Sequence, residues 1–273
     1  MGEFKDKNVI VTGASRGIGL AIAKKLATEG ANIAVLAKTD TPHPKLSGTI
    51  HTAVEEIKSL GVKSIAVKTD VRFEDQVENA IQKVIKELGS IDILINNASA
   101  ISLFNSETLP MKQFDLMHNI NIRGTYLCSK NCLQYLKKSS NPHILNLSPP
   151  INLQPKWFEN FTAYTIAKYG MSMCVIGMSE EYKKYNVAVN ALWPKTTIDT
   201  AAIRNLGGIV SPDQCRNADI MADAAYYILK RESAKYSGNF YIDEQVLAEE
   251  GIKDLDKYSI KLGSKLFTDL YLD

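Results

Sequence analysis

The chain has 273 residues, of which 45% are hydrophobic and 23% charged. Its 32 basic and 30 acidic side chains leave a formal net charge of +2. So small a charge does not indicate a nucleic-acid partner or attraction to a membrane surface. The composition therefore favours a globular protein that acts on a small molecule.

The four cysteines have no Cys-x-x-Cys spacing, so we expect neither a metal site nor a disulfide among them. No apolar stretch is long enough to span a bilayer, and residues 1–5 lack the pattern of a signal peptide. We expect no membrane insertion and a reducing, internal compartment, with the cytoplasm as the default location.

Apolar runs alternate with helical spacing along the whole chain. This alternation predicts an α/β fold, a doubly wound parallel sheet with helices on both faces. Residues 39–49 are rich in Pro, Thr and Gly and delay the helix after the second strand. We find no linker, so residues 1–273 are interpreted as one domain with a short, partly helical extension from Asp243. The expected strands are residues 7–12, 32–37, 64–68, 91–95, 142–147, 187–192 and 238–242.

The first expected strand leads into a glycine-rich turn, and a helical pattern follows over residues 20–27. Glycine permits a tight turn and lets backbone N–H groups approach a phosphate, while a helix start favours an anion. Any strand-to-helix turn can use glycine, but this order of elements indicates a pyrophosphate site. The turn consists of Gly13, Ala14, Ser15, Arg16, Gly17, Ile18 and Gly19.

Tyr164 and Lys168 stand four residues apart, which places both on one face of a helix. Adding a proton to a carbonyl oxygen needs an acid, and tyrosine, with a reference pKa of about 10, is weak unaided. A nearby ammonium group would stabilise the phenolate and lower that pKa. The alternative is a helix with a packed aromatic ring and a solvated lysine.

Four motifs in order resemble the short-chain dehydrogenase/reductase family over nearly the whole chain: the spacing Gly13-x3-Gly17-x-Gly19, the turn 96–99 (Asn-Asn-Ala-Ser), Asn121, and Tyr164-x3-Lys168. The resemblance implies a Rossmann-like fold, a nicotinamide dinucleotide cofactor and oxidoreductase chemistry. It also implies a homodimer or homotetramer, and it leaves a peroxisomal or mitochondrial location open.

The resemblance also implies roles for single residues. Tyr164 would be the acid/base, Lys168 would support it and hold the ribose, and Asn121 would hold a water that relays protons. Asn121 can also be read as a structural amide. The further cofactor contacts implied are Asp70 at the adenine amino group, Val71 beside the ring, Asn97 and Ala98 at the ribose, and Ile198 and Thr200 near the carboxamide. For Asp70, a helix N-cap is an equal alternative.

The second expected strand ends at Lys38, where dinucleotide specificity is usually decided. Lys38 and Arg16 can converge on a 2′-phosphate, and charge-assisted contacts of this kind are strong. We therefore favour NADP over NAD. Asp40, two residues on, keeps NAD open.

The family has a serine at the end of the fifth strand that polarises the substrate oxygen. Here the strand runs into Ser148-Pro149-Pro150, and the alignment puts Pro149, which offers no donor, at that position. A bulged loop would bring Ser148 into place, and Asn152 is another substitute.

We expect an NADP(H)-dependent oxidoreductase that interconverts a carbonyl and a secondary alcohol on a small, apolar or lipid-like substrate. Aromatic residues near the site suggest an apolar pocket, although such residues also serve as core: Trp157, Phe158, Phe161 and Trp193. The alternative is an NADPH-binding sensor or scaffold with little turnover. A lyase or epimerase of related fold is a third interpretation.

Overall fold

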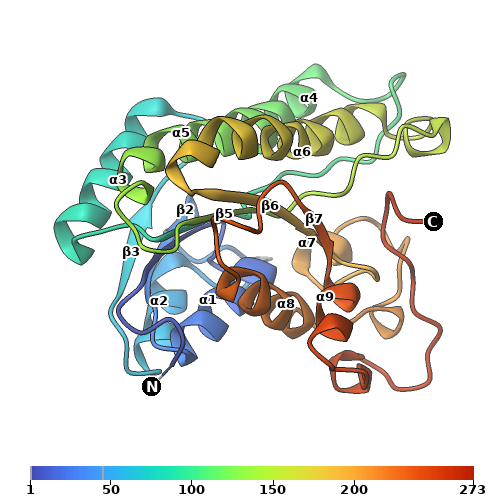
Figure 1. The fold of residues 1–273 in the computed structure, drawn as a ribbon. Helices are drawn as coiled ribbons and strands as arrows, with labels where there is room; N and C mark the ends of the chain where they lie inside the picture. The colour runs from blue at the N-terminus through green and yellow to red at the C-terminus, as the bar shows by residue number, and fades with distance from the viewer. Residues whose placement is uncertain (1, 45) are drawn as a thin grey trace.

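The computed structural model describes residues 2–44 and 46–273. Within them, seven strands form one parallel sheet in the order β3-β2-β1-β4-β5-β6-β7 (Figure 1). The doubly wound sheet expected from the sequence is confirmed, and each expected strand boundary lies within two residues of the observed one. The strands are β1 (Asn8–Thr12), β2 (Asn32–Ala37), β3 (Ser64–Lys68), β4 (Ile93–Asn96), β5 (His143–Asn146), β6 (Ala188–Trp193) and β7 (Phe240–Ile242).

Helices cover both faces of the sheet (Figure 1). One layer holds α1, α2, α8 and α9, and the other holds α3, α4, α5 and α6. The chain runs outward from β1 to β3 and then crosses back to β4, and ligands of such sheets bind at this point of reversal. The helices are α1 (Gly17–Thr28), α2 (Ile50–Lys58), α3 (Glu74–Leu88), α4 (Met111–His118), α5 (Thr125–Leu136), α6 (Thr162–Tyr182), α7 (Ala201–Arg204), α8 (Asp219–Lys230) and α9 (Asp243–Glu249).

Two apolar layers hold the helices against the sheet. Successive strand side chains point to opposite faces, so Val9 and Val11 of β1 join the layer of α1 and α8, while Ile10 joins the layer of α3 and α5. The whole of β1 is buried, as parallel strands covered on both faces require. Among the described helices, none is long and apolar enough to cross a bilayer.

The segment before α2 delays that helix, as the sequence predicts. The helix begins at Ile50, and Thr49 caps it: the Thr49 hydroxyl accepts hydrogen bonds from the backbone N–H groups of His51 and Thr52, both at 3.2 Å. The Thr52 hydroxyl in turn accepts from the Thr49 backbone at 2.8 Å. This reciprocal capping fixes where the 39–49 segment ends.

After α9 the chain returns to the carboxyl ends of the strands. Thr197 donates a backbone hydrogen bond to Phe267 at 2.9 Å, and Asp269 donates one to Lys195 at 3.0 Å. Residues 267–269 therefore lie alongside residues 195–197, directly after β6. The partly helical character expected beyond Asp243 is confirmed by α9 and by a short 3₁₀ turn at Asp256–Tyr258.

Candidate functional site

A cavity of about 730 Å³ lies among the carboxyl ends of the strands. Its walls come from the glycine turn, the ends of β2, β3 and β4, the start of α6, and the segments after β6 and α9. Most residues expected at the site line it together. They are Gly13, Ser15, Arg16, Gly17, Ile18, Lys38, Asp70, Val71, Asn97, Ala98, Tyr164, Lys168, Ile198 and Thr200. Ala14, Gly19, Asn121 and Ser148 are not part of the lining.

The glycine turn leaves room for a phosphate. Gly13 has φ +69°, and a Cβ atom there would lie 2.8 Å from the Cα of Ala98, so only glycine fits without strain. Within residues 2–44 and 46–273, no side chain caps the start of α1, and the first turn of that helix holds no acidic residue. The first backbone N–H groups of α1 are thus free to bind an anion, with the helix dipole in support. The turn fits the pyrophosphate of a dinucleotide.

Thr12 ties the glycine turn to the end of β4. Its hydroxyl accepts hydrogen bonds from the backbone N–H groups of Asn97 at 3.1 Å and Ala98 at 3.0 Å. The Asn97 amide donates to the Thr12 carbonyl at 2.9 Å. Asn96 is buried and donates to Ser129 at 3.0 Å and to Asn146 of β5 at 2.9 Å. The asparagine turn steadies the sheet by these contacts.

At the expected adenine end, Asp70 is held by Arg72. The Arg72 side chain donates to both carboxylate oxygens, and its backbone N–H donates to Oδ1 at 3.1 Å. Burial raises the pKa of Asp70, but the Arg72 hydrogen bonds outweigh it and the net pKa is lowered. The N-cap alternative for Asp70 is wrong, because Phe73 occupies the N-cap of α3. The adenine contact stays a prediction.

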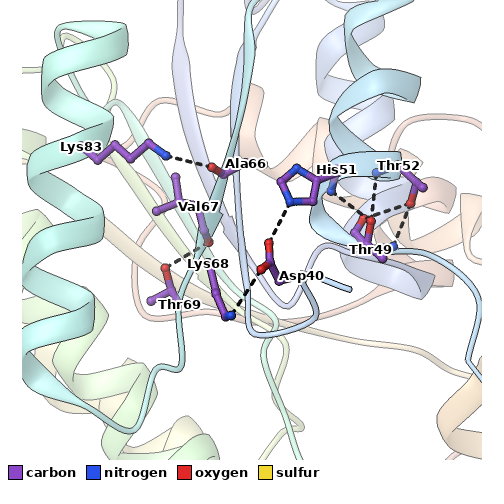
Figure 2. A network of polar contacts seen from close by, with 9 residues as sticks. All are labelled: Asp40, Thr49, His51, Thr52, Ala66, Val67, Lys68, Thr69 and Lys83. Atoms are coloured by element: carbon purple, nitrogen blue, oxygen red, sulfur yellow. Dashed lines mark hydrogen bonds and ion pairs between the residues drawn. The ribbon is translucent and has the colours of Figure 1, made fainter. Parts of the chain in front are cut away.

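Figure 2 shows that Asp40 points into a polar network of its own. Its carboxylate accepts from the Lys68 ammonium at 3.3 Å and lies 2.8 Å from the His51 imidazole. Hydrogen bonds with His51 and Lys68 lower its pKa. Asp40 does not line the cavity, whereas Lys38 and Arg16 do.

The Arg16 side chain has partners of its own. Its Nε and Nη2 donate to the carbonyl oxygens of Ser47 at 2.7 Å and Gly48 at 2.6 Å. Arg16 thus fastens the 39–49 segment to the glycine turn, a role that the sequence analysis missed. The guanidinium has five N–H donors, so these two bonds leave donors for a phosphate.

Tyr164 and Lys168 lie on one buried face of α6, 5% and 3% exposed. The Lys168 ammonium donates to the Leu147 carbonyl at 2.6 Å and lies 4.9 Å from the centre of the Trp193 ring. Burial lowers the Lys168 pKa to about 7, and the charge of Asp269 opposes part of that shift. The alternative of a solvated lysine is wrong, because Lys168 is buried.

The expectation that Lys168 lowers the Tyr164 pKa is wrong for this structure. The Tyr164 pKa is raised, first by burial and then by the negative charge of Asp269. The physical reason is that burial of the phenol and the charge of Asp269 outweigh any effect of the ammonium, which donates to the Leu147 carbonyl. The acid/base role of Tyr164 stays a prediction.

Asn121 lies in a π-helical turn, Asn119–Gly124, between α4 and α5. Its side chain accepts from the Ala100 N–H at 2.8 Å and donates to the Ala100 carbonyl at 3.0 Å. π-turns of this kind occur often at functional sites. The Asn121 side chain thus holds the backbone of Ala100, and its role with water stays a prediction.

Neither substitute for the missing serine reaches the cavity wall. Ser148 is fully buried, and its Oγ has no hydrogen-bond partner among the described residues. The Pro149 carbonyl accepts from Ser172 at 2.6 Å. The Asn152 side chain donates to Asp273 at 3.3 Å. The polarising role expected of Ser148 is therefore not supported by its position here.

Beyond β6, Ile198 is buried and Thr200 caps α7 by accepting a 3.4 Å hydrogen bond from the Ile203 N–H. Of the four aromatic residues expected at the pocket, Phe161 and Trp193 line the cavity, and Trp157 and Phe158 pack beside it instead.

Asp269 is a cavity residue that the sequence analysis missed. Burial raises its pKa to about 7, the neighbouring Asp243 adds to the shift, and the Leu270 N–H and Lys168 oppose it. The sequence has no motif around Asp269, and its position in the cavity depends on folding, because it is far from Tyr164 along the chain.

Residues 7–207 match the family described as short chain dehydrogenase, and the chain belongs to this family of NAD(P)-dependent oxidoreductases. Its curated relatives include hydroxysteroid dehydrogenase-like protein 2 of Bos taurus, 58% identical over 272 residues, and of Danio rerio, 56% identical over 272 residues. Each match covers 100% of this chain and 65% of the relative, so the chain spans about two thirds of their length.

A solved short chain dehydrogenase from Mycobacterium thermoresistibile is 47% identical, with a TM-score of 0.93. The match covers 99% of this chain and 96% of that one. The likeness extends through the segment after α9, which lies beyond the residues matched by the family.

Proposed function

We propose that this chain is an NADP(H)-dependent oxidoreductase that interconverts a carbonyl and a secondary alcohol on a small, apolar or lipid-like molecule. The observation that carries the proposal is one continuous cavity that joins the glycine turn to Tyr164 and Lys168. A phosphate site and a buried proton donor in one cavity are what hydride transfer to a carbonyl requires.

When bound, the nicotinamide supplies or accepts the hydride. Tyr164 supplies or accepts the proton at the reacting oxygen through its Oη atom. Lys168, which donates to the Leu147 carbonyl, would hold the ribose of the cofactor and adds positive charge to the cavity when protonated.

Lys38 and Arg16 support NADP as the cofactor. Both line the cavity beside the end of β2, and the nearest acidic candidate, Asp40, is bound to Lys68 and His51 (Figure 2). Fluorescence titration with NADPH and NADH tests this choice. We expect tighter binding of NADPH, and equal or tighter binding of NADH would contradict it.

The cavity wall beyond Tyr164 supports an apolar substrate. Apolar residues that line the cavity include Leu103, Phe161, Ile209, Val210 and Leu270. Apolar walls with a few polar groups are typical of small-molecule sites. A hydroxysteroid, as in the name of the curated relatives, is one molecule of this class.

One observation favours the alternative, an NADPH-binding sensor or scaffold. Ser148 is withdrawn from the cavity, and the loss of one oxyanion-type donor costs about 10²–10³ in rate. Turnover that is slow but dependent on Tyr164 would still separate an enzyme from a sensor.

Tyr164→Phe tests the enzyme directly. General acid–base catalysis contributes about 10²–10⁴-fold, so we expect a loss of that order in NADPH consumption with medium-chain or steroid carbonyls. NADPH affinity should change little. An unchanged rate would overturn the role of Tyr164, and the absence of dinucleotide binding in the wild type would overturn the whole proposal.

We also propose that the chain forms a homodimer or homotetramer through α5 and α6. Large apolar side chains are exposed on these helices: Tyr126 is 54%, Ile166 44%, Met173 59% and Ile176 51% exposed. Exposed apolar patches of this kind mark protein interfaces. Light scattering of the wild type and of Met173→Glu measures the mass, and a monomeric wild type would overturn the assignment.

A further inference from the structure

The segment after α9 is fixed on both sides of Asp269. The Asp269 backbone bonds to the Lys195 carbonyl, and the Leu270 carbonyl accepts from the Trp193 indole at 2.9 Å. Tyr271 is 1% exposed, and its ring lies 5.1 Å from that of Tyr169, centre to centre. Main-chain hydrogen bonds and aromatic packing on both sides therefore hold Asp269 in place.

The charge of Asp269 acts on the two groups expected to do the chemistry. It lines the same cavity as Tyr164 and Lys168. Its Oδ1 accepts from the Leu270 N–H at 2.7 Å, and Oδ2 has no hydrogen bond among the described residues. One carboxyl oxygen is thus available to a molecule in the cavity.

The hydrogen-bond donor that the family places beside the tyrosine is not supplied by Ser148 in the part of the chain that the structure describes. Ser148 lies outside the cavity wall, and Lys168 is bonded to Leu147. A protonated carboxyl group can donate the hydrogen bond that a serine would otherwise supply.

We propose that Asp269 is a further catalytic residue, whose carboxyl group donates a hydrogen bond to the oxygen of the reacting carbonyl beside Tyr164. This inference rests on the proposed oxidoreductase function. The hydride and the transferred proton come from the cofactor and Tyr164 as described above. The Asp269 proton stays on its carboxyl group and only forms a hydrogen bond to the substrate oxygen.

The surroundings of Asp269 suit this task. Burial and the nearby Asp243 raise its pKa to about 7, so the donating form is well populated below neutral pH. Carbonyl reduction should therefore slow as the pH rises through this range. The titratable groups that interact with Asp269 are Tyr164 and Lys168 of α6, Asp243 of α9, Cys215, and Tyr271 of its own segment.

The test compares Asp269→Leu with Asp269→Asn in NADPH-dependent reduction of 2-decanone, a neutral apolar ketone. Asp269→Leu removes the donor, and we expect a fall in kcat of about 10²–10³-fold with NADPH affinity unchanged. Asp269→Asn keeps an N–H donor at every pH. It should stay within about tenfold of the wild type and lose the alkaline decline.

Asp273→Asn is the matched control, because Asp273 lies in the same segment and pairs with Lys156 outside the cavity lining. Its kcat and pH profile should equal those of the wild type. Binding of 2-decanone to the complex with NADP⁺, read from tryptophan fluorescence, measures the donor without turnover. It should weaken above neutral pH in the wild type and remain flat in Asp269→Asn.

Three results would overturn the inference. Asp269→Leu could retain the full rate. Asp269→Asn could move the alkaline decline to lower pH, which would mean that Asp269 acts only as the counter-charge of Lys168. A wild type that binds NADPH but neither binds nor reduces 2-decanone would overturn the apolar-carbonyl assignment and this role with it. Failure to bind NADPH would instead refute the proposed function.

Discussion

At the glycine turn the cavity wall is made largely by main-chain groups of the turn and of the adjacent end of β4, whereas beside Tyr164 it is completed by side chains from the segment after α9. The Thr12 hydroxyl and the Asn97 side-chain amide fix the first region by hydrogen bonds to main-chain groups, and Gly13 fixes it by its close approach to Ala98. Tyr271 and Asp269 complete the second through tertiary packing. The comparison teaches that cofactor binding and substrate chemistry depend on separate sets of contacts, which can be perturbed one at a time.

The largest expected effect comes from Tyr271→Ala, which breaks the second region alone. Removing a fully buried aromatic ring costs about 3–5 kcal/mol in the free energy of unfolding. Asp269 would lose its anchor, so turnover should fall while NADPH still binds. Urea unfolding and NADPH titration measure the two effects. Tyr236→Ala, at a residue 45% exposed, should change neither, and loss of NADPH binding in Tyr271→Ala would show that the regions are not separate.

Lys38→Glu perturbs the first region and tests whether the protein prefers NADP over NAD. A hydrogen bond to a charged group is worth about 1.5–3 kcal/mol, which corresponds to about 10–100-fold in NADPH affinity. NADH affinity should change much less. Lys63→Glu, at an exposed lysine outside the cavity lining, is the control for net charge. Equal losses for both cofactors would contradict a 2′-phosphate contact.

Gly19→Ala tests whether the first region is fixed by close packing. A Cβ atom at Gly19 would lie 2.4 Å from the Asn97 side-chain nitrogen and 3.1 Å from the Ala14 Cα. We expect a loss of about 1–3 kcal/mol in stability, with weaker NADPH binding. Gly177→Ala on α6 is the matched control, since nothing lies within 4 Å of its added Cβ. An unchanged melting temperature in Gly19→Ala would refute the packing argument.

The smallest expected effect is in the pH dependence of stability. The pKa values of Asp243 and Asp269 are raised to about 7, first by burial, so the folded chain binds more protons than the unfolded chain between about pH 4 and 7. Stability should therefore fall as the pH rises through that interval. Asp243→Asn cannot titrate and should show a shallower fall between pH 5 and 8 in chemical unfolding.

Asp213→Asn controls for this last variant, because Asp213 is exposed and paired with Lys261 at 2.8 Å. It should keep the slope of the wild type. A slope in Asp243→Asn as steep as that of the wild type would place the titration elsewhere.

The difference between the two regions also explains what the sequence predicts. Gly13, Gly19 and Asn97 are recognisable because close backbone approach restricts the residue type at each position. Tyr164 and Lys168 are recognisable because a helix fixes their spacing. By contrast, Asp269 has no local signature, and the direction in which the Lys168 ammonium points depends on a carbonyl at the end of β5.

The N-cap interpretation of Asp70 was wrong for a local reason, because its carboxylate pairs with the Arg72 side chain two residues on and Phe73 takes the N-cap position. Two other residues depend on distant contacts. Trp157 and Phe158 pack against the Tyr271 and Tyr169 rings of other segments, so pattern alone could not separate them from Phe161 and Trp193.

The π-helical turn at Asn119–Gly124 has a consequence for the helices on either side of it. A residue added to a helix rotates everything after it by about 100° around the axis. The wide turn therefore lets α4 and α5 follow one another without sharing a single apolar stripe. Buried Met117 can belong to the aromatic cluster beside the cavity, and Cys128 and Cys132 to the apolar layer between α5 and the sheet. α4 and α5 are thus continuous but bury side chains against different parts of the molecule. A single-residue deletion in the π-helical turn would change the face that α5 presents to the sheet.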